Sequence, residues 1–380
     1  MALENKIESV KVQGFRSLAD VELANIPDAA VLIGPNGSGK SNVFLFLEML
    51  QQMLCHRRLN QFVRRHGGAD DQLFGGSSQT PTLSSQVRLK YQQRTYNYEC
   101  SLSYIQPDEF SVEQERGLLY SEERAGPVGR EILNWGKESG IFPIDPQNQS
   151  NFGTDDSFFY ESSKKIRDFL GGWSFHQFHN TGFHSDIKKW HDIEDNVGLN
   201  SDGSNLASVL YRLEREDERL YNYICQQISR VLPSFDRFAV GRAYGKAMLR
   251  WKAVNYDKPM GAHLTSDGSL RAFALLTLLN LPADMLPSVV FLDEPELGLH
   301  PSAISLLGGM IKVLSVQRQV ILATQSPLLV DSFDLDQIFV LDLKDGQTKI
   351  SRPNSEELRD WLEEYSTGGL WQTNIIGGRP

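Results

Sequence analysis

Residues 34–41 read GPNGSGKS and combine the residue types that bind phosphate groups. Glycines let the backbone curl so that successive N–H groups face one anion. Lys40 adds a point charge for the β- and γ-phosphates of a nucleotide, and the hydroxyl of Ser41 is a ligand for Mg²⁺. The stretch follows an apolar run and precedes a helical pattern, which is the context that this phosphate-binding motif requires.

Two adjacent carboxylates, Asp293 and Glu294, form the second chemical group, within SVVFLDEPELGLHP (288–301). The apolar residues before them predict a buried strand that presents both carboxylates at its C-terminal end, where α/β sheets bind ligands. We expect Asp293 to hold Mg²⁺ together with Ser41, and Glu294 to orient and deprotonate an attacking water.

The third group lies in LTSDGSLR (264–271), directly before an apolar helical pattern. A helix N-terminus that bears Ser266 and Gly268 is an anion site, because free N–H groups, a hydroxyl and the positive end of the helix dipole converge there. The loop at 34–41 already encloses its own nucleotide, so this second clamp fits a nucleotide held by another copy of the chain. The alternative is a helix that is merely capped by serine.

The elements that must position these groups are visible as alternating and continuous apolar runs. Residues 121–165 are rich in turn formers and predict a lid or insertion. The stretch 204–231 predicts one or two amphipathic helices with Ser204 as a cap, and 355–365 a final helix capped by Ser355. Strands are predicted at 7–15, 21–26, 29–34, within 83–120, and at 289–292, 319–324 and 337–343, with a helix at 41–54.

Composition bounds the class of protein. The chain has 380 residues, 40% of them hydrophobic, and a formal net charge of -10, which argues against coating nucleic acid through bulk charge. Its three cysteines are widely spaced, so neither a disulfide framework nor a zinc site is expected. No signal peptide or membrane span is predicted, and we expect a cytoplasmic protein without a membrane partner.

These motifs in this order resemble the ABC-type ATPases of the SMC/RecF group: GPNGSGKS, TSDGSLR, VVFLDEPELGLHP and LATQSP. The resemblance implies an α/β fold: a P-loop head with a mixed sheet, an antiparallel β-subdomain and a helical insertion. We expect residues 1–120 and 235–380 to form the two halves of the head, and 121–234 the insertion.

The resemblance also implies that two heads close face to face over two ATP molecules with Mg²⁺. Each ATP then lies between the P-loop of one head and the Ser266–Gly268 signature of the other. Arg16, in the strand turn GFRSL, is implied to lie near the nucleotide, with the alternative that it is only a turn residue. The implied nucleotide contacts from the P-loop are Gly34, Pro35, Asn36, Gly37, Ser38, Gly39, Lys40, Ser41 and Asn42.

The sequence departs from transporter-type relatives at two positions of the site. TSDGS replaces LSGGQ, and Gln325 replaces the switch histidine. Glutamine hydrogen-bonds a γ-phosphate or a water but does not carry a proton at neutral pH, so we expect slow hydrolysis suited to a switch. His300 is expected either to reach across the dimer or to cap a helix.

The C-terminal stretch resembles stand-alone AAA_21-type ATPases, which are often found in anti-phage defence operons with a separately encoded, commonly nuclease-like effector. The sequence stops near the point where the head should end, so we expect any nuclease to be a separate protein. One function is then an ATP-driven sensor for that effector, which acts as a dimer or within a higher assembly.

Two alternatives stay open. A RecF-like DNA repair or chromosome-maintenance ATPase would bind DNA directly, and a transporter subunit is the weaker third candidate. Four arginines in CHRRLNQFVRRHGG (55–68) either complement a helix dipole or contact a nucleic-acid backbone: Arg57, Arg58, Arg64 and Arg65.

Overall fold

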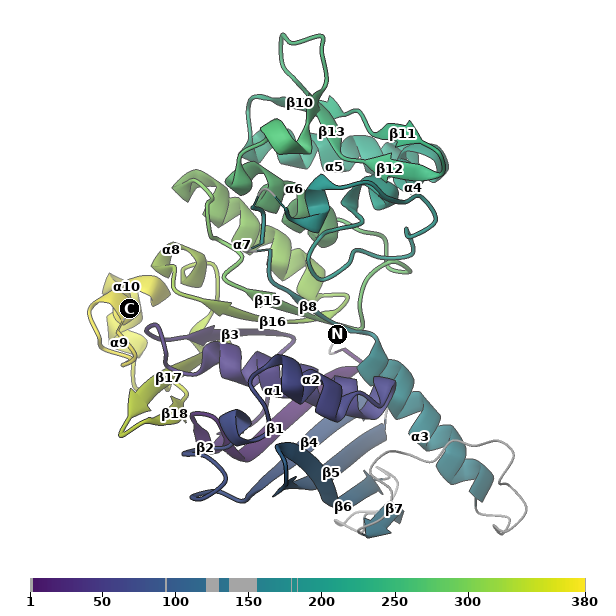
Figure 1. The fold of residues 1–380 in the computed structure, drawn as a ribbon. Helices are drawn as coiled ribbons and strands as arrows, with labels where there is room; N and C mark the ends of the chain where they lie inside the picture. The colour runs from purple at the N-terminus through teal and green to yellow at the C-terminus, as the bar shows by residue number, and fades with distance from the viewer. Residues whose placement is uncertain are drawn as a thin grey trace.

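The computed structural model describes residues 3–92, 94–120, 130–136, 156–178, 180–182 and 184–379. Figure 1 shows an antiparallel sheet at the bottom, a mostly parallel sheet above it, and a helical part at the top. Helix α1 (Lys40–His56) lies between the two sheets, while α6 (Asp267–Leu279) and α7 (Pro301–Ser315) cover the other face of the parallel sheet. Most of the predicted lid at 121–165 lies outside the described residues.

The parallel sheet positions the chemical groups. Its strand order is β18-β17-β3-β16-β15-β8, and all neighbours are parallel except β17 and β18. Both of its faces are covered, so β3 and β16 are buried along their whole length, and β15 and β17 over their first four residues. The strands are β3 (Ala29–Ile33), β8 (Trp173–His176), β15 (Val289–Asp293), β16 (Gln319–Thr324), β17 (Ile338–Lys344) and β18 (Gln347–Ser351).

Strand β3 shows how one strand serves two cores. Ala29, Val31 and Ile33 point toward the cluster of α4 to α7, and Ala30 and Leu32 toward the cluster around α1 and the antiparallel sheet. This follows from the period of two along a strand. The predicted mixed fold, with helices on both faces and an antiparallel β-subdomain, is therefore present.

The antiparallel sheet has the order β2-β1-β4-β5-β6-β7. Buried Gln319 joins it to the parallel sheet: its Oε1 accepts from Ile7 N at 2.8 Å and its Nε2 donates to Ile7 O at 2.9 Å. The Gln319 side chain thus pairs with both the backbone N–H and the backbone C=O of Ile7, and its own buried amide is hydrogen-bonded in return. The strands are β1 (Lys6–Phe15), β2 (Leu18–Leu23), β4 (Thr82–Tyr91), β5 (Arg94–Ile105), β6 (Glu109–Tyr120) and β7 (Arg130–Gly136).

The stretch expected to be an insertion is not separate from the head. After α3 (Asp156–Gly171), strand β8 pairs with β15 inside the parallel sheet. Two helices follow, α4 (Leu206–Glu216) and α5 (Glu218–Val231), as predicted, but the N-cap of α4 is Asn205 rather than Ser204. The top also holds β9 (His191–Asp192), β10 (Phe235–Phe238), β11 (Gly241–Ala243), β12 (Lys246–Met248), β13 (Arg250–Ala253) and β14 (Met260–Gly261).

The predicted C-terminal helix is shorter than expected. Helix α9 (Arg359–Glu364) begins after Leu358, so Ser355 does not cap it. Residues 355–358 form turns instead, and α9 buries none of its side chains, so no tertiary contact extends the helix toward Ser355. The remaining helices are α2 (Leu59–Arg65), α8 (Pro327–Val330) and α10 (Thr367–Gln372).

Among the described residues, no helix is both long enough and apolar enough to span a bilayer.

His176, at the end of β8, should make folding sensitive to acid. It is 2% exposed, and burial lowers its pKa from 6.5 to about 3. Between these two pKa values the unfolded chain binds a proton that the folded chain does not. The contribution of His176 to the free energy of unfolding is therefore complete above pH 6.5 and is lost as the pH falls from 6.5 toward 3.

We expect the wild type to lose about 2 kcal/mol more unfolding free energy between pH 7 and pH 5 than His176→Asn does. Urea unfolding of both proteins at each pH measures this, and comparison within each protein removes the effect of the substitution itself. Equal losses in the two proteins would contradict the burial of a neutral imidazole.

Candidate nucleotide and magnesium site

The predicted phosphate loop connects β3 to α1, as its motif requires. Gly34, Gly37 and Gly39 all have positive φ, at 149°, 78° and 103°. A Cβ at Gly34 would lie 2.1 Å from the carbonyl oxygen of Leu341, and one at Gly39 would lie 2.1 Å from Thr348 Oγ1. Backbone conformation and space therefore both demand glycine at these two positions.

Lys40 is 5% exposed and folds back onto the loop. Its Nζ donates to the carbonyl oxygens of Gly34 at 2.7 Å and Pro35 at 2.9 Å. Burial lowers the pKa of Lys40, while the carboxylates of Glu294, Asp293 and Glu296 raise it. The ammonium is therefore held inside the concavity where a phosphate oxygen would replace the two carbonyls.

Ser41 and Asp293 come together across the sheet edge. Ser41 Oγ donates to Asp293 Oδ2 at 3.1 Å, and Gln177 Nε2 donates to the same oxygen at 3.3 Å. The hydroxyl and the carboxylate are oxygen donors of the kind that Mg²⁺ prefers, and a turned Gln177 amide would present its Oε1 as a third. Gln177 belongs to no motif of the sequence. Its place directly after the short strand WSFH, at the same carboxyl edge as Asp293, is the signal that could have found it.

Glu294 stands in a strained conformation next to Asp293. Its φ is 47°, in the left-handed region, which costs a residue with a side chain roughly 1–3 kcal/mol. Its backbone N–H donates to Ala323 O at 2.9 Å, and its Oε1 accepts a hydrogen bond from Gln325 Nε2. The predicted base and the predicted switch glutamine are therefore in direct contact in this structure.

Glu296, also missed by the sequence analysis, lies just beyond. Its Oε1 accepts from Thr324 Oγ1 at 2.6 Å and from Gln325 N at 3.0 Å. Burial raises its pKa, since a charged carboxylate loses hydration there. Nothing in the motif DEPE distinguishes this glutamate from a solvated acid, so only the fold reveals it.

A hydroxyl network holds the phosphate loop from behind. Ser17 Oγ pairs with Thr348 Oγ1 at 2.8 Å and accepts from Asn42 Nδ2 at 2.8 Å. Thr348 Oγ1 donates to Ser38 O at 2.9 Å. Asn42, predicted to contact nucleotide, is therefore engaged with Ser17. Asn36 and Gly37 are exposed at the tip of the loop.

Arg16 adopts a positive φ of 45° in the turn between β1 and β2. Its Nε donates to Gln72 Oε1 at 3.0 Å and its Nη2 to His66 O at 3.3 Å, and burial lowers its pKa. The structure thus gives Arg16 a turn-stabilising role and places it directly before Ser17 of the hydroxyl network.

Ser266 and Gly268 lie at the N-terminus of α6. Ser266 is the N-cap: its exposed hydroxyl accepts from Ser269 N at 3.2 Å. A Cβ at Gly268 would lie 2.7 Å from the carbonyl oxygen of Gly298, so the glycine lets α6 approach the loop after Glu296. No hydrogen bond among the described residues connects either to the phosphate loop. His300 is the N-cap of α7, accepting from Ser302 N, which is the capping alternative.

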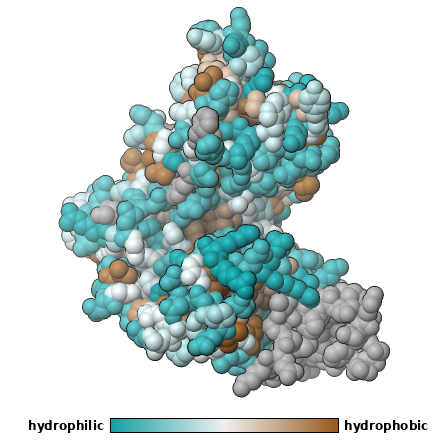
Figure 2. Space-filling view, in the orientation of Figure 1, coloured by the Kyte–Doolittle hydropathy of each residue, from teal (hydrophilic) through white to brown (hydrophobic). Residues whose placement is uncertain are grey.

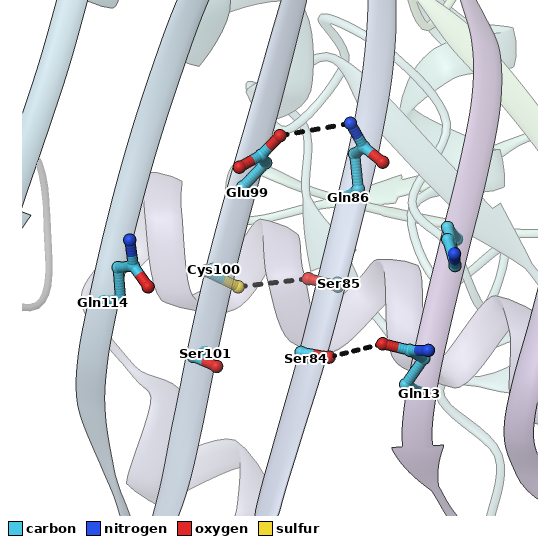
Figure 3. A pocket seen from close by; sticks show the side chains of 9 residues that line it. Gln13, Ser84, Ser85, Gln86, Glu99, Cys100, Ser101 and Gln114 are labelled. Carbon is cyan, nitrogen blue, oxygen red and sulfur yellow. Dashed lines mark hydrogen bonds between the residues drawn. The ribbon is translucent and has the colours of Figure 1, made fainter.

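A hollow of about 300 Å³ lies away from this site, on the antiparallel sheet (Figure 3). Its polar side chains bond one another, with Gln86 Nε2 to Glu99 Oε1 at 3.1 Å and Ser84 Oγ to Gln13 Oε1 at 3.0 Å. No residue of the phosphate loop lines it, and we assign it no role.

Residues 29–331 match the AAA_21 family model, described as "AAA domain, putative AbiEii toxin, Type IV TA system". An 87-residue segment is 41% identical to the DNA replication and repair protein RecF of Anaeromyxobacter sp. (strain Fw109-5), covering 22% of this chain and 23% of that protein. A 72-residue segment is 44% identical to RecF of Anaeromyxobacter dehalogenans (strain 2CP-C), covering 18% and 19%. The chain thus matches about a fifth of the length of these relatives.

Two solved structures share the fold. The SMC head bound to the C-winged helix domain of ScpA aligns with a TM-score of 0.59 and 14% identity, over 93% of this chain and 99% of that one. The Pyrococcus furiosus Smc head with an extended coiled coil, bound to the C-terminal domain of ScpA, aligns at 0.53 and 13%, over 95% and 99%. The fold is that of an ABC-type head, and the chain belongs to the AAA_21 family.

Proposed function

We propose that the protein binds ATP with Mg²⁺ and hydrolyses it slowly, as a switch between open and closed head-to-head dimers. The observation that carries this proposal is the meeting of Lys40, Ser41, Asp293, Glu294 and Gln325 at one edge of the sheet, where a P-loop and two carboxylates face each other.

The chain's own residues divide the work within one subunit. The loop N–H groups and Lys40 bind the β- and γ-phosphates, and Ser41, Asp293 and Gln177 hold Mg²⁺. The metal, when bound, neutralises charge that develops on the phosphate oxygens. Glu294 orients the attacking water and takes its proton once Gln325 releases Oε1. Gln325 then hydrogen-bonds the γ-phosphate or the water without carrying a proton.

The partner copy contributes the second phosphate clamp in this proposal. Ser266 and Gly268 stand at an exposed helix N-terminus that is not bonded to the phosphate loop of its own chain. Two copies that face each other complete two sites, each with a P-loop and a signature. Arg16 and Asn42 would contact the nucleotide after breaking their present hydrogen bonds within the chain.

We propose the cytoplasm as the site of action and a separately encoded, nuclease-like effector as the partner in anti-phage defence. The toxin–antitoxin description of the family supports a defence role. The SMC heads that share the fold are bound to a domain of a second protein, ScpA, which supports an ATPase that works through a partner.

A second candidate, direct DNA binding by a RecF-like ATPase, is favoured by a specific surface. Arg57, Arg58 and Arg65 are exposed at the end of α1 and on α2, with no ion pair to the described part of the chain, while Arg64 pairs with Glu109. Figure 2 shows a continuous hydrophilic area where Figure 1 places α2. Clustered arginines on a chain of net charge -10 fit a phosphate backbone.

Glu294→Gln should lower the hydrolysis rate by roughly 100-fold or more, because the general base is lost while the phosphate contacts remain. It should accumulate as a dimer in ATP and Mg²⁺, as measured by light scattering after size exclusion. Lys40→Ala, which loses ATP binding itself, is the control that stays monomeric. Unchanged turnover in Glu294→Gln would rule out its role as the base.

Ser266→Arg should bind ATP with wild-type affinity but fail to dimerise, since a bulky cation replaces the hydroxyl that faces the partner's nucleotide. Ser266→Ala controls for the lost cap, which costs about 1 kcal/mol. Ser355→Arg makes the same change at an exposed serine on another part of the surface. A Ser266→Arg protein that still forms the ATP dimer contradicts the two-headed site.

If the protein binds DNA through this surface, replacing Arg57 and Arg65 by glutamate should make the fall of log affinity with log salt less steep, by roughly two units of slope. The measurement is fluorescence anisotropy with a labelled duplex oligonucleotide over a salt series. The matched control reverses two exposed arginines of α5, Arg219 and Arg230. Equal slopes in all three proteins would remove the arginine surface from consideration.

A further inference from the structure

Glu296 follows Glu294 by two residues, and its carboxyl group has no role in the catalysis or the metal binding proposed above. Glu296 Oε1 accepts two hydrogen bonds, from Thr324 Oγ1 at 2.6 Å and from Gln325 N at 3.0 Å. Both donors belong to the segment that carries the switch glutamine. Glu296 itself belongs to the loop of residues 295–299, which we call the coupling loop. One carboxyl oxygen therefore joins two loops that follow different strands.

The coupling loop packs against the N-terminus of α6, the helix that carries Ser266 and Gly268 and is called the signature helix below. Leu297 N donates to Glu294 O at 3.1 Å, and Leu299 N donates to Glu296 O at 3.0 Å, so the loop is a compact series of turns. Its Gly298 packs against Gly268, where a Cβ would lie only 2.7 Å from the Gly298 carbonyl. Two backbones in contact transmit a displacement with little slack, because no side chain lies between them to repack.

The contacts that run from Gly268 through the coupling loop to Glu296 continue to the switch glutamine, Gln325. Gln325 Nε2 donates to Glu294 Oε1, so the base is held by the residue whose backbone is bonded to Glu296. A γ-phosphate that attracts the Gln325 side chain would release Glu294. The backbone bond to Glu296 would carry the same movement to the coupling loop.

We propose that Glu296 is a positioning residue that couples the switch segment at Thr324 and Gln325 to the coupling loop and thereby to the signature helix. This inference rests on the proposed ATPase function. A nucleotide that moves Gln325 would then also move Ser266 and Gly268 into position for the partner's nucleotide. Release of the base and presentation of the signature become one event.

The bonding pattern says which feature of the side chain matters. Both hydrogen bonds use Oε1 as an acceptor, and Oε2 is buried without a hydrogen-bond partner in the described part of the chain. An amide oxygen accepts the same two bonds. The coupling therefore needs the acceptor and the length of the side chain, while the charge is dispensable.

Four proteins test this: the wild type, Glu296→Ala, Glu296→Gln and, in the second readout, Thr324→Val. The first readout is hydrogen exchange of peptides that cover residues 34–42, 295–300 and 321–329, without nucleotide and with ATP and Mg²⁺. In the wild type, ATP should protect all three segments. In Glu296→Ala, protection of 34–42 should persist and protection of 295–300 should be lost. Glu296→Gln should respond as the wild type does.

The second readout is steady-state hydrolysis. We expect Glu296→Ala to lose about tenfold in kcat with KM for ATP little changed, since both hydrogen bonds that position the switch segment on the coupling loop are removed. Rescue by Glu296→Gln separates coupling from charge. Thr324→Val, which removes only one of the two donors, should fall between wild type and alanine.

The outcomes separate the two proposals. A wild type that shows no ATP-dependent protection of 34–42 and no hydrolysis overturns the proposed function, and this inference with it. A wild type that responds to ATP, beside a Glu296→Ala protein whose 295–300 segment responds equally, overturns the coupling alone. A merely structural Glu296 would lower the melting temperature of the alanine variant while leaving the ATP response of 295–300 intact, and that result also overturns it.

Discussion

The site depends on three carboxylates that share the field of one ammonium group. Asp293, Glu294 and Glu296 all raise the pKa of Lys40, whereas burial lowers it. Three like charges at one edge of a sheet repel one another, and a triphosphate adds more negative charge to the same place. The fold therefore has to bring donors there as well: loop N–H groups, the Ser41 hydroxyl and the Gln177 and Gln325 amides. Burial raises the pKa of Glu296, so its charged form loses more hydration there than at an exposed site.

The parts of the site that the sequence predicted are those whose chemistry is local. GPNGSGKS specifies its own backbone through glycines with positive φ, and VVFLDE specifies a buried strand with carboxylates at its end. The positions of the buried strands along the chain followed from their continuous apolar runs, but their order in the sheet did not. The helix caps were less predictable. Ser266 caps α6, but Ser204 and Ser355 cap no helix. Serine is common in turns as well as at helix N-termini, so its presence alone does not locate a helix start.

The residues that the sequence did not reveal are those that act across the fold. Gln177 reaches Asp293 from 116 positions away, and Ser17 reaches Thr348 from 331 positions away. A lone glutamine or threonine carries no local signal of such a contact. Gly268 shows a different limit. The signature motif explains its conformation at a helix start, yet its packing on Gly298 gives a second, independent reason for glycine, so the motif alone cannot say which cause dominates.

The hydroxyl network behind the phosphate loop also sets an order of events during synthesis. Thr348, which bonds Ser38 and Ser17, is translated more than 300 residues after them, and β3 is flanked by β16 and β17 from the last fifth of the chain. A ribosome that has completed the P-loop sequence has therefore not yet supplied the strands and the hydroxyl that shape it. Such long-range pairing slows folding. A chain that ends before Thr348 therefore lacks part of the framework that shapes its phosphate loop.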